Sequence, residues 1–283
     1  MAHVFSENDS AARSVVRGDW FYWRFIGTAI GFFAFGLGAL LLSVAFPVLR
    51  LLPRPRCQQL SRSALQGVLR TYLALVSGLG TISYELHGVE RLGRPGQLII
   101  ANHPTLIDAL FLIAFTPQAV CVAKGALFRS FLIRNVIAAT GYISNELTAD
   151  MIESAATALR AGECLIMFPE ATRTRVGEPL LFQRGAANIG VRAATHVTPV
   201  YITCHPITLT KAEPWYRIPP RRAHFTLRVG EDFSLAEYRA NPSIPLGSRA
   251  FNELLQANFE RELQRPHGYT SGSSTGNESE LAG

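Results

Sequence analysis

The first part of the chain is a long stretch of apolar positions that has no alternation with polar ones. Residues 25–49 contain no charged residue and lie between Arg24 and Arg50. A helix of this length is about 37 Å long, against about 30 Å for the hydrocarbon core of a bilayer. The aromatic residues at 20–23 precede the run, where membrane helices often carry an aromatic belt. The pattern predicts a membrane helix over residues 20–52.

Two other interpretations of this run are weaker. A signal peptide has a shorter apolar region, of about 7–15 residues, and a small-residue cleavage site that is not found here. A helix buried in a protein core is rarely uncharged over such a length. The sequence does not decide whether the helix crosses both leaflets or enters one.

A second helix is expected over residues 57–80, after the proline-containing segment LLPRPR at 51–56. Its apolar residues recur at helical spacing and form one broad face. Arg62 and Arg70 are expected to extend toward lipid headgroups. Residues 20–83 are therefore predicted to form a membrane-anchoring helical pair, preceded by a loose N-terminus at 1–19.

From about residue 84, short apolar runs alternate with segments of helical periodicity. This alternation predicts an α/β domain over 84–265, with a sheet covered by helices. The tail at 266–283 is rich in Gly and Ser and is expected to be disordered. Strands are expected at 97–101, 119–123, 164–168, 197–202 and 224–229, and helices at 105–115, 126–139, 149–161, 184–194 and 246–264.

The charge balance indicates an anionic partner. The chain has 27 Lys and Arg against 21 Asp and Glu, a net charge of +6. With the apolar run, this charge favours a membrane surface over nucleic acid. More arginines follow the run than precede it, which predicts that the main body lies on the cytoplasmic side of the inner or plasma membrane. The four cysteines have no C-x-x-C spacing, so a metal site is not expected.

The segment NHPTLID at 102–108 follows an expected strand and carries candidate chemistry. On one helix, residues five apart do not face each other. His103 in the loop and Asp108 in the next helical turn would meet, however, and a carboxylate on one imidazole nitrogen leaves the other free as a base. Alternatively, Asp108 caps a backbone turn and His103 is an ordinary loop residue.

The segment FPEATRTR at 168–175 follows another expected strand. Glu170 places a carboxylate at that strand end, and Arg173 supplies a forked cation suited to phosphate. Strand ends in α/β sheets are where ligand crevices form.

The order and spacing of these two segments resemble those of the glycerolipid acyltransferases of the lysophosphatidic acid acyltransferase type. The family signature is N-H-x4-D followed about sixty residues later by F-P-E-G-T-R. Later segments FQRGAANIG (182–190) and VTPVYI (197–202) resemble further family elements, and the likeness extends over residues 84–230. The N-terminal helical pair is similar to the membrane-docking helices of that family.

The resemblance implies transfer of an acyl chain from acyl-CoA or acyl carrier protein to a hydroxyl of a lysolipid, with 1-acylglycerol-3-phosphate as acceptor and phosphatidate as product. The resemblance implies that His103 is the base and that Asp108 orients it. No metal or redox cofactor is implied, and the donor is a co-substrate. The residues that would contact substrate are Asn102, Glu170, Thr172, Arg173, Gly185 and Pro199.

Two positions depart from the family pattern. Ala171 replaces the glycine of the second signature, and Asn145 stands where many phosphatidate-forming members carry an arginine. The second change keeps other acceptors open, namely a lyso-ornithine lipid, a glycolipid or another specialised lipid. Lys124 and Arg134 lie nearby in the sequence but not at the motif position.

Two other classes of function fit the sequence less well. A serine hydrolase would use the G-x-S-x-G at 272–276, but this motif lies in the polar tail without the strand and helix that a nucleophile elbow needs. A non-enzymatic membrane-binding protein is the remote alternative, because it would explain the positive charge but not the two motifs.

Overall fold

The computed structural model describes residues 20–146, 148–170, 179–211 and 213–265. The proposed loose N-terminus at 1–19, Ala171, Thr172, Arg173, the G-x-S-x-G motif and the tail at 266–283 lie outside the described residues.

A seven-stranded sheet forms the centre of the molecule, in the order β1-β7-β6-β2-β5-β3-β4. The five strands from β6 to β4 are parallel, whereas β7 is antiparallel to β6 and pairs with β1. The strands are β1 Ile82–His87, β2 Gln97–Ala101, β3 Val120–Ala123, β4 Ile143–Ser144, β5 Leu165–Met167, β6 His196–His205 and β7 Ala223–Val229.

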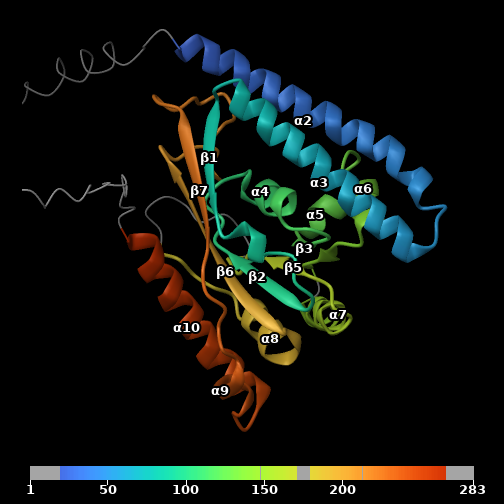
Figure 1. The fold of residues 1–283 in the computed structure, drawn as a ribbon, viewed down its shortest axis with the longest axis vertical. Helices are drawn as coiled ribbons and strands as arrows, with labels where there is room; N and C mark the ends of the chain where they lie inside the picture. Colours follow the sequence, from blue (N-terminus) through green and yellow to red (C-terminus); the bar gives the residue numbers. More distant parts are fainter. Residues whose placement is uncertain (1–19, 147, 171–178, 212, 266–283) are drawn as a thin grey trace, which may run out of the picture.

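Helices cover both faces of this sheet (Figure 1). Side chains of the central strands alternate between the faces, so Ile99 and Ile166 join one apolar core and Leu98 and Leu165 join the other. The helices are α2 Phe21–Leu49, α3 Arg54–Gly78, α4 Asp108–Phe115, α5 Gly125–Phe128, α6 Arg134–Thr140, α7 Thr148–Arg160, α8 Gly185–Ala193, α9 Ala236–Arg239 and α10 Ile244–Gln264, with a 3-10 turn η1 at Val89–Arg91.

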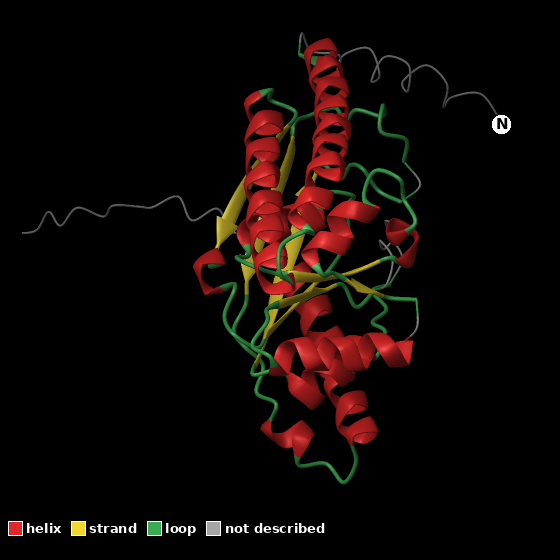
Figure 2. Ribbon diagram, turned by 90° about the vertical axis from the view of Figure 1, so that its right-hand side faces the viewer, coloured by secondary structure: helices red, strands yellow, loops and turns green. Residues whose placement is uncertain are grey.

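Helices α2 and α3 form an antiparallel hairpin that lies against the α/β domain (Figures 1 and 2). The helices approach closely at Gly31, where a Cβ atom would lie 3.0 Å from Cγ1 of Val76 in α3. Arg24 of α2 donates a hydrogen bond to the Pro220 carbonyl at 2.8 Å, and Asn135 of α6 donates to the Ser43 carbonyl at 3.0 Å. The hairpin is therefore fastened to the domain along its length.

The structure corrects the expectation for Arg62 and Arg70 in α3. Arg62 is buried, donates to the Thr140 carbonyl at 2.8 Å and pairs with Glu163 at 3.2 Å. Arg70 donates to the Ala114 carbonyl at 2.7 Å, at the C-terminal end of α4. Both arginines connect α3 to the α/β domain and do not extend to headgroups.

Other element boundaries also differ from the expected ones. Strands β1 and β4 were not expected, and the helix expected at 126–139 is divided into α5 and α6. The helix expected from 105 begins at Asp108, because the three residues before it are needed for the loop that holds His103.

Candidate active site

The ends of β2 and β5 place both sequence motifs at the same edge of the sheet. The two strands pair in parallel, with Ile100 opposite Met167, so their C-terminal ends are neighbours. Asn102 and His103 follow β2, and Phe168 follows β5. The rings of His103 and Phe168 stack with their centroids 4.4 Å apart. The crevice position expected for an open α/β sheet is therefore where the motifs meet.

His103 and Asp108 form the predicted pair. Nδ1 of His103 lies 2.9 Å from Oδ2 of Asp108, whose side chain is fully buried. Asp108 also accepts hydrogen bonds from the backbone N–H and the hydroxyl of Thr105, both at 2.6 Å. The carboxylate is held by the tight turn before α4, and it fixes the imidazole so that Nε2 is the nitrogen left to act as a base.

The surroundings of Asp108 act in opposite directions on its pKa. Burial raises the pKa of this carboxyl above its ordinary value, because the charged form loses its hydration. The hydrogen bonds from His103 and Thr105, and the positive charge of a protonated His103, lower it again. The net pKa of Asp108 is raised, so the ionised carboxylate depends on its contacts with His103 and Thr105.

Two further motif residues hold the backbone around His103. Oε1 of Glu170 accepts a hydrogen bond from the backbone N–H of His103 at 2.9 Å. The amide of Asn102 donates to the Ile202 carbonyl and accepts from the Ile202 N–H, both at 2.8 Å. Because both polar atoms of Asn102 are engaged by β6, the structure gives Asn102 a positioning role in place of the expected contact with substrate.

A large cavity adjoins His103. Its volume is about 1080 Å³, at the upper end of the usual range for ligand pockets. Its walls are mainly apolar and come from α2, α3, α4, α6 and the strand ends; they include Gly31, Phe35, Tyr72, Leu110 and Ile137. The shape and lining suit a long hydrocarbon chain.

The remaining predicted site residues differ in position. Gly185, at the start of α8, lines the cavity. Pro199 does not: it is buried within β6, opposite Ile100 of β2, and its ring lies against Gly230. Pro199 is therefore not among the residues that line this cavity, and a role in shaping the acyl-chain groove stays a prediction.

Five cationic residues line the cavity, and none was predicted as a site residue: Arg24, Lys124, Arg184, Lys211 and Arg217. Lys124 follows β3 and Arg184 precedes α8; both are exposed and line the cavity. No acidic partner of either lies among the described residues. Lys124 lies outside the motif position in the sequence, but the parallel arrangement of β3 and β5 brings it to the same edge of the sheet. In the described part of the chain, His, Cys, Asp and Glu side chains do not gather as a metal site.

Several known proteins are similar to this chain in sequence. Residues 83–203 match the family model described as Acyltransferase. The 1-acyl-sn-glycerol-3-phosphate acyltransferase of Borreliella burgdorferi is 28% identical over 142 residues, which cover 47% of this chain and 56% of that protein. The human 1-acyl-sn-glycerol-3-phosphate acyltransferase alpha is 29% identical over 147 residues, 49% of this chain and 52% of that protein. The chain thus matches about half the length of these curated relatives.

A solved structure has the same fold. The 1-acyl-sn-glycerophosphate acyltransferase PlsC from Thermotoga maritima superimposes with a TM-score of 0.61 at 18% sequence identity, covering 86% of this chain and 97% of that one. In the matched family model, in the curated relatives and in its fold, this chain is similar to the lysophosphatidic acid acyltransferases.

Proposed function

We propose that this protein transfers a fatty acyl chain from a thioester to a hydroxyl of a lysolipid. The observation that supports the proposal most strongly is a histidine–aspartate pair at the wall of an apolar cavity of about 1080 Å³. The pair supplies a base, and the cavity supplies room for the hydrocarbon part of a lipid substrate.

In the proposed reaction, Nε2 of His103 takes the proton of the acceptor hydroxyl while its oxygen attacks the thioester carbonyl carbon. A carbon–oxygen bond forms, the carbon–sulfur bond breaks, and the leaving thiolate takes the proton from the imidazolium. Asp108 stabilises the imidazolium, because the buried carboxylate gains a positive neighbour. Glu170 keeps the backbone of His103 in place for both steps.

For the acceptor we propose 1-acylglycerol-3-phosphate, which would give phosphatidate. Lys124 and Arg184 support this choice, because two cations at one cavity fit a phosphate group. Asn145 is the observation on the other side. It accepts a hydrogen bond from the Gly125 N–H at 3.1 Å, beside Lys124, and supplies no charge where many family members have an arginine. A phosphate-free acceptor is therefore the second candidate.

The test is acyl transfer from labelled acyl-CoA and from acyl carrier protein to lysophosphatidic acid, lyso-ornithine lipid and a lysoglycolipid. Turnover on lysophosphatidic acid that is lost in Lys124→Gln but kept on the other acceptors would support the phosphate assignment. Turnover on phosphate-free acceptors alone would keep the chemistry and overturn the acceptor. Absence of transfer with every pair would contradict the proposed reaction.

We also propose that the protein binds one leaflet of a membrane through the outer face of α2. This helix is long and apolar enough to cross a membrane by length and composition. It is, however, fastened at both ends to the domain, by Arg24 to the Pro220 carbonyl at 2.8 Å and by Ser43 to the α6 region. Crossing the bilayer would carry polar parts of the domain into hydrocarbon.

Site-specific labelling tests this arrangement. Cysteines introduced at Trp20 and Leu52, at opposite ends of α2, should both react with an impermeant reagent from the same side of sealed vesicles. The four natural cysteines are buried and serve as the unlabelled background. Labelling of the two positions from opposite sides would show that α2 spans the membrane.

A further inference from the structure

The turn between α2 and α3 carries positive charges that no acidic side chain among the described residues neutralises. No Asp or Glu occurs between Trp20 and Tyr84. The other arginines of the hairpin, Arg24, Arg62 and Arg70, are engaged by carbonyls of the domain. At the turn, the arginines are exposed and have no acidic partner among the described residues: Arg50, Arg54 and Arg56.

Two of these arginines line a pocket of about 280 Å³, separate from the cavity at His103. Its inner wall is the C-terminal end of α6, whose carbonyl groups would otherwise attract cations. Those of Ala139 and Thr140 already accept from Cys57 and Arg62. The pocket is lined by Arg50, Leu52, Arg54, Cys57, Gln58, Ala138, Ala139 and Gly141, so its only charges are positive.

The placement of Arg54 is electrostatically unfavourable for the isolated helix. It is the first residue of α3, where the helix dipole is positive, and the first turn contains no acidic residue to offset it. An anion in the pocket would relieve the repulsion between Arg50, Arg54 and the helix end.

The pocket adjoins an exposed apolar surface. On α2 and its C-terminal end, Leu51 is 85% and Val44 69% exposed, and Phe131 of the α5–α6 loop is 71% exposed. Ser43 donates to the Phe131 carbonyl at 3.4 Å, so Phe131 lies beside this helix face. A phosphate next to such a surface is provided by a phospholipid headgroup, with its acyl chains beside α2.

We propose that the pocket of Arg50 and Arg54 binds the phosphate of an anionic phospholipid headgroup in the leaflet, as a site distinct from the substrate cavity. Its occupant is a lipid of the membrane surface, and the two arginines and Gln58 contact its phosphate. The site fixes the orientation of the hairpin on the membrane, because the aromatic residues at the other end of α2 supply only a nonspecific interfacial contact.

The test is co-sedimentation of the full chain with vesicles of phosphatidylcholine alone and of phosphatidylcholine mixed with phosphatidylglycerol. The variant Arg50→Gln/Arg54→Gln should bind the mixed vesicles more than about tenfold more weakly, and the neutral vesicles as well as the unchanged protein does. Arg56→Gln is the matched control, because it removes a charge from the same turn but outside the pocket. We expect it to change binding by less than about twofold, whereas a diffuse charge effect would give about fivefold per arginine.

Equal losses for Arg56→Gln and for single Arg50→Gln or Arg54→Gln would overturn the site, as would equal binding of neutral and mixed vesicles by the unchanged protein. A folded state of each variant is checked by its thermal unfolding. The readout is lipid binding without turnover, so a failure here leaves the acyl-transfer proposal intact, and loss of turnover leaves the lipid site intact.

Discussion

Two aspartates lie near opposite ends of the central strands and have opposite displacements of their pKa. Asp108 follows the C-terminal end of β2, is fully buried and contacts His103. Asp232 lies beside the N-terminal ends of β2 and β6, has a side chain 30% exposed and pairs with Arg94 at 2.7 Å. Burial raises the pKa of Asp108. It would also raise that of Asp232, but Arg94, Thr198 and His196 lower the pKa of Asp232 below its ordinary value.

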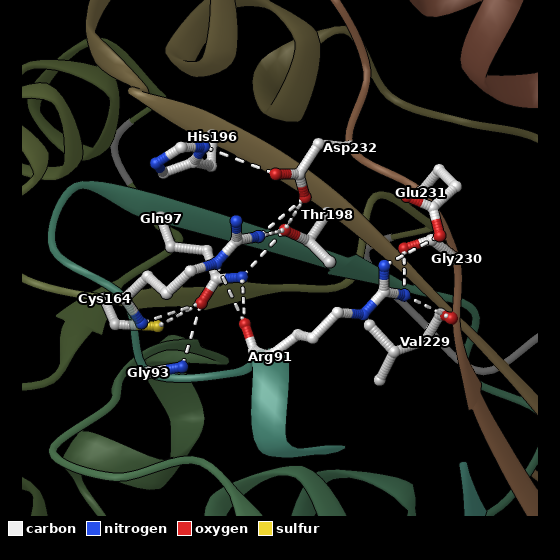
Figure 3. A network of polar contacts seen from close by, with 11 residues as sticks. Arg91, Gly93, Gln97, Cys164, His196, Thr198, Val229, Gly230, Glu231 and Asp232 are labelled. Atoms are coloured by element: carbon white, nitrogen blue, oxygen red, sulfur yellow. Dashed lines mark hydrogen bonds and ion pairs between the residues drawn. The ribbon is translucent and has the colours of Figure 1, made fainter. Parts of the chain in front are cut away.

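At the edge of the sheet formed by the N-terminal ends of β2 and β6, polar side chains form a network of hydrogen bonds and ion pairs (Figure 3). Gln97 donates to the Thr198 hydroxyl at 2.8 Å and accepts from the N–H groups of Gly93 and Arg94. Thr198 in turn donates to Asp232 at 2.6 Å. A carboxylate that faces a permanent cation stays ionised, whereas the buried carboxylate of Asp108 faces an imidazole that can exchange a proton with a substrate. The same residue type therefore serves structure at one edge and chemistry at the other.

The largest expected effect comes from Asp108→Asn. An amide cannot stabilise the imidazolium and favours the wrong tautomer of His103, so kcat/KM for acyl transfer should fall about a thousandfold. Asp232→Asn is the matched control and should keep nearly full kcat/KM. Similar losses of kcat/KM in both variants would contradict the assignment of chemistry to Asp108 and of structure to Asp232.

A smaller effect is expected from Arg94→Met at the structural edge. The change leaves Asp232 and Thr198 without their shared cation, so the free energy of unfolding should fall by about 2 kcal/mol, as measured by denaturant unfolding. The kcat of the folded fraction should stay unchanged. A reduced kcat with unchanged stability would assign Arg94 to the site.

The smallest effect is a pH dependence of opposite sign for the two aspartates. The lowered pKa of Asp232 stabilises the fold above the ordinary aspartate pKa, and this contribution is lost as pH falls toward the lowered value. Asp232→Asn should therefore cost about 1 kcal/mol at neutral pH and less in acid.

For Asp108 the sign is reversed. Because its folded-state pKa is raised, the unfolded chain ionises first as pH rises, and the fold loses stability above the ordinary aspartate pKa. Unfolding curves should be measured across the acid range. As pH rises, the free energy of unfolding of the unchanged protein should fall relative to that of Asp108→Asn. The same slope for both aspartates would refute the contrast.

The sequence predicted the elements that have strong periodicity and the motif residues that meet at one edge. Residues 97–101 and 164–168 are apolar runs typical of buried parallel strands, and His103 and Asp108 meet as expected. Strand β1 was missed although its apolar positions alternate, because the change in pattern was placed at residue 84 and divided the strand.

Tertiary contacts decided what the sequence could not. The exposed or buried state of Arg62 depends on the position of the Thr140 carbonyl, 78 residues later in the chain. Lys124 joins the cavity only because β3 is parallel to β5. Pro199 does not line the cavity. A shift of one residue in the register of β6 would exchange the faces on which its side chains lie.

The most direct test of the account is turnover of purified His103→Ala on the acceptor that the unchanged protein uses, measured together with its thermal unfolding. We predict a loss of kcat/KM of at least about a thousandfold with an unfolding temperature close to that of the unchanged protein. Transfer at an unchanged rate would contradict the assignment of His103 as the base. It would also remove the chemical role given to the C-terminal edge of the sheet.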